Sequence, residues 1–200
     1  KFNAWGNKFD WELDNKQTLS LCDKQVFKSE VNYVDHLDFV LEGGSVESNG
    51  NGLLLVTESC LMNPNRNGVI SKNEVEAKLK EELCVKDVLW LKHGKIMGDD
   101  TDGHVDTLVR FVNENTLVYV QCLDEKDVHY NSLKLMEKEL KQLCAEFSLS
   151  MIPLPIPDII IDQKNKKRLP ATYANFLITN DVVLVPSYEC SHDEQVKTIL

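Results

Sequence analysis

The sequence predicts an α/β protein built from repeated strand–strand–helix–strand units, and three observations support this. Three hairpin patterns recur along the chain, an amphipathic helix pattern follows each of the first two, and a further strand pattern follows each of these helices. The cysteines that end the hairpins, Cys60, Cys122 and Cys190, lie 62 and then 68 residues apart. Periods of this length are typical of arrays or propellers of supersecondary units.

Each hairpin is predicted by two apolar runs that flank an Asn-rich turn. The three stretches are SVESNGNGLLLVTESC (45–60), TLVRFVNENTLVYVQC (107–122) and TYANFLITNDVVLVPSYEC (172–190). Asn and Gly tolerate the positive φ angles that tight hairpin turns require. We therefore expect a β-hairpin in each stretch.

The first helix after a hairpin is predicted by Val75, Leu79 and Leu83, which recur at four-residue spacing. Ser71 is the expected N-cap of this helix, with Glu74 three residues later. Helical patterns also cover residues 131–147 and 191–200, and strand patterns follow at 88–91 and 148–156.

The N-terminal part resembles the end of an earlier unit. Residues 15–31 have a helical pattern, and LDFVL at 37–41 follows as its closing strand. We therefore expect one domain over residues 1–200, incomplete at both ends, with units at about 42–103, 104–171 and, in part, 172–200. The chain is then expected to be an internal portion of a longer protein.

Composition narrows the classes of function. The formal net charge of −10 argues against nucleic acid and anionic membranes as partners, and it suits a cationic substrate. No apolar run approaches the roughly 20 residues that cross a bilayer, and no secretion signal is visible at the N-terminus. The six cysteines are widely spaced without a CxxC pair, which indicates reduced thiols in a cytoplasmic protein.

Two stretches imitate metal sites. NPNRNGVISKNE (63–74) has Asn at alternate positions like a calcium loop, but only Glu74 is acidic and a strand enters it, so a plain loop is favoured. In DDTDGHVD (99–106), His104 and Asp106 could bind zinc, but no Cys or His partner lies at a recognisable spacing. His93 has the setting of a surface turn. We expect no metal site.

A catalytic interpretation of DDTDGHVD competes with that of an acidic hairpin entrance. We expect His104 and Asp106 to stand at the mouth of a strand, where alternate residues share a face. A histidine beside a carboxylate is an acid–base element. Glu42, in LEGGS, precedes the first hairpin as His104 precedes the second, one period of 62 residues away. In a ring of units the two would face one another, whereas in a Gly-rich surface turn Glu42 would be exposed.

Four motifs carry a resemblance over nearly the whole chain. LEGGSVESNGNGLLLVTESCLMNPNRN, DDTDGHVDTLVRFVN, YANFLITNDVVLVP and FNAWG (2–6) resemble agmatine deiminases, members of the guanidine-modifying superfamily that also holds bacterial peptidyl-arginine deiminases. The resemblance implies a pentein-type α/β propeller of five modules around a central active site, of which this chain would carry about three. It also implies hydrolysis of agmatine to N-carbamoylputrescine and ammonia, a step of polyamine biosynthesis, with no metal or organic cofactor.

The resemblance also implies residue roles. His104 would shuttle protons, Glu42 would pair with it, Asp106 would grip the guanidinium, and Asp100 would contact the far end of the substrate. By family pattern a cysteine thiolate attacks the guanidinium carbon, and it stands in a Gly-rich His-Cys segment that this sequence lacks. The second guanidinium-binding aspartate belongs to an Arg-Asp-x-Gly-Pro motif that is also missing. Cys190 comes nearest in sequence order, but it ends a strand as Cys60 and Cys122 do.

Three alternatives remain open from the sequence. The rival enzymes are a peptidyl-arginine deiminase and a free-arginine deiminase, and the latter would need a basic residue for the substrate carboxylate. A third alternative is a non-catalytic guanidine-binding propeller. The resemblance further suggests a cytoplasmic homodimer, and without the two missing motifs we expect the chain alone to be inactive.

Overall fold

The first repeated unit is a three-stranded sheet with one long covering helix. The computed structural model describes residues 1–200. The sheet has the order β1-β2-β3, with β2 antiparallel to β1 and parallel to β3. The elements of this unit are η1 (Gly43–Ser45), β1 (Val46–Ser48), β2 (Leu53–Thr57), α3 (Glu58–Leu61), α4 (Pro64–Asn67), α5 (Lys72–Leu83) and β3 (Asp87–Leu91).

The second unit repeats this topology. Its sheet has the order β4-β5-β6, again with one antiparallel and one parallel pair. Its elements are the 3-10 helix η2 (Val105–Thr107), β4 (Val109–Asn113), β5 (Thr116–Gln121), α6 (Tyr130–Phe147) and β6 (Ser150–Pro155). The remaining elements are α1 (Ala4–Asn7), α2 (Asp14–Asp23), β7 (Leu177–Ile178), β8 (Val183–Leu184) and α7 (Asp193–Ile199).

The predicted hairpins are confirmed, as are the helices after the first two hairpins and the one near the C-terminus. The helical pattern at 15–31 is confirmed only in part, because α2 ends at Asp23. All three hairpins form, although β7 and β8 pair over only two residues each. Helix α5 begins with the predicted capping box, because the Ser71 hydroxyl accepts from Glu74 N–H while the Glu74 carboxylate accepts from Ser71 N–H. Both closing strands, β3 and β6, lie parallel to the central strand of their sheet.

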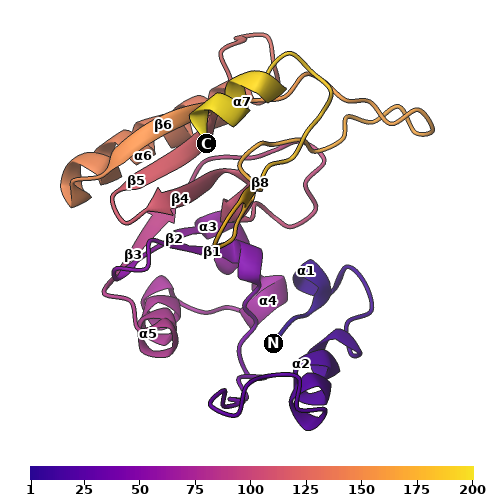
Figure 1. Cartoon of the computed structure of the whole chain (residues 1–200), viewed down its shortest axis with the longest axis vertical. Coiled ribbons are helices and arrows are strands. Elements are labelled where there is room, and N and C mark those ends of the chain that lie inside the picture. Colours follow the sequence, from indigo (N-terminus) through magenta and orange to yellow (C-terminus); the bar gives the residue numbers. More distant parts are fainter.

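Helices and sheets alternate in layers (Figure 1). Leu54 and Val56 of β2 pack with Val75 and Leu79 of α5, whereas Leu55 points to the opposite face. On that face, α6 fills the space between the two sheets through Leu133, Met136 and Leu140, which share one core with Leu55, Leu89, Leu91, Leu117 and Tyr119. Val118 and Leu154, on the far face of the second sheet, pack with Val196 of α7. Strands that are buried on both faces explain the continuous apolar runs LLLV and LVYV.

Two sequence expectations are wrong. Residues 37–41 do not form a closing strand; instead, the side chain of Asn67 donates to Val40 O at 2.9 Å and accepts from Val40 N–H at 2.7 Å, which satisfies the backbone there without a sheet. His104 and Asp106 do not stand at the mouth of a strand. His104 directly precedes η2 and Asp106 lies within it, and β4 begins only at Val109.

The two termini lie in opposite halves of the molecule along its long axis (Figure 1). The N-terminus lies beside α1, α2 and α4, and α7 leads to the C-terminus in the other half. None of the helices is both long and apolar enough to cross a membrane. All six cysteines are free, and Cys60, Cys122 and Cys144 are buried.

Candidate active site

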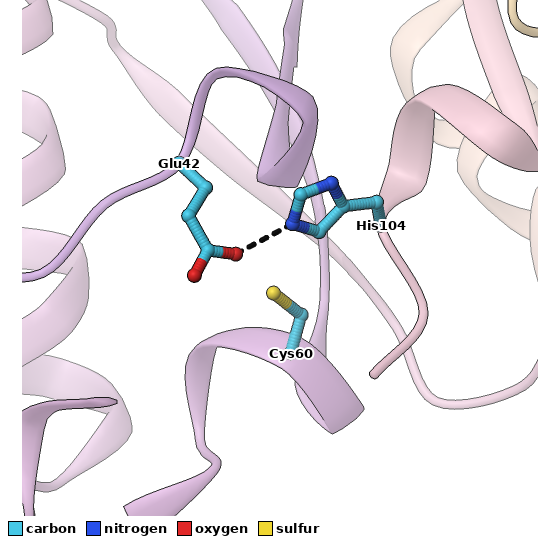
Figure 2. Close-up of side chains that lie close together, drawn as sticks. All are labelled: Glu42, Cys60 and His104. Atoms are coloured by element: carbon cyan, nitrogen blue, oxygen red, sulfur yellow. Dashed lines mark hydrogen bonds and ion pairs between the residues drawn. The ribbon is translucent and has the colours of Figure 1, made fainter. Parts of the chain in front are cut away.

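Glu42 and His104 meet at equivalent places in the two units. Each stands directly before a 3-10 helix, Glu42 before η1 and His104 before η2. Figure 2 shows the Glu42 carboxylate directed at the His104 ring, with Nε2 of His104 2.5 Å from Oε2 of Glu42. Both residues are buried, at 5% and 7% exposure. The predicted meeting of these two residues is confirmed, and an exposed Glu42 is excluded.

The second glycine of LEGGS allows this contact. A Cβ on Gly44 would lie 2.5 Å from Nδ1 of His104 and 2.7 Å from Oδ2 of Asp106, closer than real Cβ contacts. Gly43 has no such neighbour, because nothing lies within 4 Å of its Cβ position. Gly44 therefore permits His104 and Asp106 to approach the backbone together. His104 and Asp106 were predicted to lie on one side of the chain, and both do lie beside Gly44. A 3-10 helix brings them together, however, and not the alternation of side chains along a strand.

Arg66 completes the surroundings of Glu42, and the sequence interpretation missed it. Its Nε and Nη2 contact Oε1 and Oε2 of Glu42 at 3.1 and 2.8 Å, a bidentate arrangement. Its Nη1 donates to Oδ2 of Asp102 at 2.8 Å, and Nη2 also donates to Thr101 O at 2.8 Å. The residue lies in α4 and is buried, although NPNRN reads as a surface loop.

The charges of this cluster are fixed by these contacts. Burial would raise the pKa of Glu42, but hydrogen bonds from His104 and Arg66 outweigh burial and hold that pKa below its usual value. Asp102 behaves in the same way, because Lys8 and Arg66 lower its pKa against the effect of burial. The carboxylate beside the His104 ring is therefore an anion in the neutral range of pH.

Asp106 is in the opposite situation. Its Oδ1 is buried without a hydrogen-bond partner, and burial raises the pKa of this carboxyl group. An unpartnered carboxylate oxygen is costly to bury unless a cation or a donor binds it. Asp106 is therefore the acceptor in this cluster that is suited to a cationic ligand.

The acidic stretch 99–106 divides its carboxylates among different tasks. Asp99 accepts from Thr101 N–H and Gly103 N–H and so shapes the turn itself. Asp100 is exposed, and only its backbone oxygen has a partner, Lys8 Nζ. The side chain of Asp100 thus has no hydrogen bond or ion pair with Glu42, His104 or Asp106, and its predicted role at the far end of a substrate stays a prediction.

Cys60 lies beside the pair, with its thiol within 4.8 Å of the facing atoms of Glu42 and His104 (Figure 2). These distances would suit a metal ion. However, burial raises the pKa of the Cys60 thiol to about 12, and Arg66 already contacts both oxygens of Glu42. In this structure the cluster is held together by the hydrogen bonds and ion pair among Glu42, Arg66 and His104.

Comparison with known proteins agrees with this arrangement. The family model for Porphyromonas-type peptidyl-arginine deiminases matches residues 1–200. The chain belongs to this family. Among curated members, it is 32% identical to the agmatine deiminase of Pseudomonas fluorescens (strain Pf-5) and 31% identical to that of Stutzerimonas stutzeri (strain A1501).

Solved structures of family members have the same mixed α/β fold. A cysteine-to-serine variant of the C. jejuni agmatine deiminase, solved with substrate bound, is 43% identical and superposes with a TM-score of 0.90. This chain is covered to 99% in that comparison, and the C. jejuni chain to 56%. The two curated relatives are each covered to 59% by the whole of this chain. The chain therefore spans about three fifths of the length of the family members that it matches.

Arg66 escaped the sequence interpretation because its setting imitates another kind of site. The Asn residues at 63 and 67 were compared with calcium ligands, but they bond to protein groups. Asn63 caps α4 and donates to Asp102, and Asn67 bonds to Val40. The sequence feature that could have identified Arg66 is its position as a single arginine among asparagines. Asparagine side chains bond to the backbone and make a turn compact, and a compact turn can hold a buried guanidinium.

Proposed function

We propose that this protein is an agmatine deiminase, which hydrolyses agmatine to N-carbamoylputrescine and ammonia. The observation that carries the proposal is the buried Glu42–His104 pair beside Asp106, whose Oδ1 has no partner. A guanidinium group remains protonated at any working pH, so a carboxylate is the natural group to hold it. The names of the curated relatives and of the C. jejuni structure support agmatine as the substrate.

The proposed chemistry combines these groups with the cysteine nucleophile that the family resemblance implies. A cysteine thiolate adds to the guanidinium carbon, and His104 in its protonated form gives the departing nitrogen its proton, so that ammonia leaves. Neutral His104 then takes a proton from the water that attacks the amidino-thioester, and the thiolate departs. Glu42 holds the ring of His104 through both protonation states, and Asp106 binds the guanidinium nitrogens.

We assign the nucleophile and the second guanidinium-binding carboxylate to parts of the relatives' length that this chain does not span. Cys60 is unsuited to attack, because it is buried and its pKa of about 12 keeps it a thiol. Cys190 contacts Tyr173 Oη at 3.1 Å and lies in another part of the core. The 200-residue chain alone is therefore expected to show no turnover.

The architecture is part of the same proposal. We take units 42–103, 104–171 and, in part, 172–200 as modules of a five-bladed propeller, with the remaining blades in the length that the relatives have in addition. Two facts support this, namely the identical strand order of the two sheets and the meeting of Glu42 and His104 across one period of 62 residues. From the family resemblance we also infer a homodimer and a cytoplasmic location.

Agmatine is favoured over free arginine by the state of Arg66. A free amino acid would bring a carboxylate that needs a cationic partner. Arg66 is the buried cation of this cluster, and its donors are taken by Glu42, Asp102 and Thr101. It therefore has no face to offer to a substrate carboxylate, whereas agmatine carries none.

The test is ammonia release by the complete protein from agmatine, free arginine and a capped arginine peptide in parallel. Turnover of agmatine alone supports the proposal. Turnover of free arginine or of the peptide instead would identify the protein as an arginine deiminase or a peptidyl-arginine deiminase. No turnover by a folded protein that binds agmatine in calorimetry would identify a guanidine-binding protein without chemistry.

A further inference from the structure

We propose that Arg66 is a positioning residue of the reaction centre, held in place by Asp102 and Lys8, that keeps Glu42 oriented toward His104 as an anion. The proposal rests on the deiminase function proposed above and adds how its acid–base pair is fixed. It assigns a role to a stretch, NPNRN, that the reaction itself does not use.

Alternating charges connect the surface with the buried histidine. Lys8 Nζ lies 2.8 Å from Oδ1 of Asp102, and Oδ2 of Asp102 lies 2.8 Å from Nη1 of Arg66. Arg66 then contacts both oxygens of Glu42, and Oε2 of Glu42 reaches His104. Asp102, Arg66 and Glu42 therefore each lie between two partners, and the series ends at the ring whose charge changes during the reaction.

Burial rises sharply from Lys8 and Asp102 to the Arg66–Glu42 contact. The side chains of Lys8, Asp102 and Arg66 are 33%, 25% and 1% exposed, and that of Glu42 is 3% exposed. Charge interactions are strongest where water is excluded, so the Arg66–Glu42 contact, together with the His104 hydrogen bond, keeps Glu42 ionised against its burial. Asp102 balances the second half of the guanidinium charge from the more solvated side.

The geometry requires an arginine. Its planar fork offers Nε and Nη2 to the two oxygens of one carboxylate and leaves Nη1 for a second carboxylate. A lysine has a single ammonium group at this place, which would keep the charge but not the fixed plane. Arg66 thus defines the direction of the Glu42 carboxylate as well as its ionisation.

The helix that carries Arg66 is fixed from two sides. The side chain of Asn63 caps α4 and also donates to Asp102 at 3.1 Å. The N-terminal segment covers the other side, where Asn3 Nδ2 donates to Asn65 O at 2.8 Å and a Cβ on Gly6 would come within 3.1 Å of Asn65 Cβ. The segment that ends at Lys8 therefore packs on the turn that holds Arg66.

The test compares Arg66→Gln and Arg66→Lys in the complete protein, with Arg168→Gln as the matched control. Arg168 forms a simpler arginine–carboxylate–histidine series, because its Nη1 contacts Asp127 at 2.9 Å and Asp127 contacts His129 at 2.7 Å. For Arg66→Gln we expect kcat for agmatine to fall on the order of 10²-fold, with KM changed less than about threefold. The acid limb of the kcat profile should move to higher pH, because Glu42 then takes up a proton more easily.

The conservative variant and a spectroscopic measurement separate positioning from folding. Arg66→Lys should return the acid limb toward its wild-type position, and it replaces the Gln variant if that one does not fold. The side-chain carboxyl carbon of Glu42, followed by NMR in protein with labelled glutamate, should titrate at higher pH in Arg66→Gln than in wild type. This measurement needs no turnover.

Each outcome decides the proposal. An unmoved Glu42 titration, together with a loss of activity no larger than that of Arg168→Gln, would assign Arg66 to stability alone and overturn it. A shifted titration in a protein that does not turn over agmatine would retain the positioning role and reject the deiminase function. A shift of the Glu42 titration together with a shift of the acid limb of kcat supports the positioning role and the deiminase function.

Discussion

Gly44 and His104 are in such close contact that residue 44 has no room for a side chain. A Cβ there would lie 2.5 Å from Nδ1 of His104, while the neighbouring Gly43 has open space at the same position. The two glycines of LEGGS therefore differ in what they do, although the sequence presents them as equals. This difference gives a matched pair of variants.

Gly44→Ala should lower kcat for agmatine by roughly 10²-fold, because moving His104 and Asp106 by a fraction of an ångström to an ångström misaligns them with the substrate. Gly43→Ala, with no neighbour to displace, should leave kcat within about twofold of wild type. Steady-state kinetics and thermal unfolding of both variants check this. Equal kinetics for the two would mean that the contact at Gly44 has no part in the reaction.

His104→Ala should abolish turnover in the complete protein without unfolding it. Glu42 keeps its two contacts with Arg66 when the ring is removed, so no buried charge is left unpaired. Ammonia release and circular dichroism measured on the same sample provide the check. Near-normal turnover would end the assignment of His104 as the proton carrier.

Asp106→Asn should abolish agmatine binding and, at pH 7, raise the unfolding temperature by on the order of a few degrees. Burial raises the pKa of Asp106 in the folded protein, so its ionisation destabilises that state as the pH rises from the ordinary aspartate range, about 3.9, through the raised pKa. The amide cannot ionise and avoids this loss. The gain over wild type should disappear below about pH 4, where the carboxyl group is protonated in both states.

Asp127→Asn provides the control of opposite sign for that experiment. Burial would raise the pKa of Asp127, but hydrogen bonds from His129 and Arg168 hold it below its usual value. Its ionisation therefore stabilises the folded state above the ordinary aspartate range, and the amide should lower the unfolding temperature at pH 7. Unfolding temperatures that change in the same direction for both variants would contradict the assigned environments.

Cys60 should resist alkylation by iodoacetamide in the native protein at pH 8, while Cys84 should react. Burial raises the pKa of Cys60 to about 12, and Cys84 is exposed at the end of α5. Only the thiolate reacts at an appreciable rate. Mass spectrometry of peptides after a short treatment distinguishes the two, and rapid labelling of Cys60 would restore it as a candidate nucleophile.

Turnover of agmatine should survive treatment with EDTA. Glu42, Cys60 and His104 are near enough to one another for a metal, but Arg66 engages both oxygens of the carboxylate. Activity before and after chelation, with the metal content measured in parallel, checks this expectation. A loss that zinc restores would revive the metal interpretation of DDTDGHVD.

Local patterns were sufficient for most of the elements. The capping box at Ser71 and Glu74, the Asn-rich turns and the apolar stripe of α6 depend on neighbours within one helix or hairpin, so the sequence carries them directly. The spacing of 62 residues between Glu42 and His104 also predicted their meeting, because repeated units place equivalent residues alike. The role that this pair would have in a reaction remains a prediction.

The sequence by itself therefore determined the repeated units, the family motifs and the pairing of Glu42 with His104. Only the tertiary structure decided that Arg66 is buried against Glu42, that Asp102 rather than Asp100 supports it, and that Lys8 joins from 94 residues away. It also decided that residues 37–41 satisfy their backbone through Asn67 instead of forming a strand. The physical reason is that a buried charge or backbone group needs a partner, and which distant residue provides that partner depends on packing, which no local pattern records.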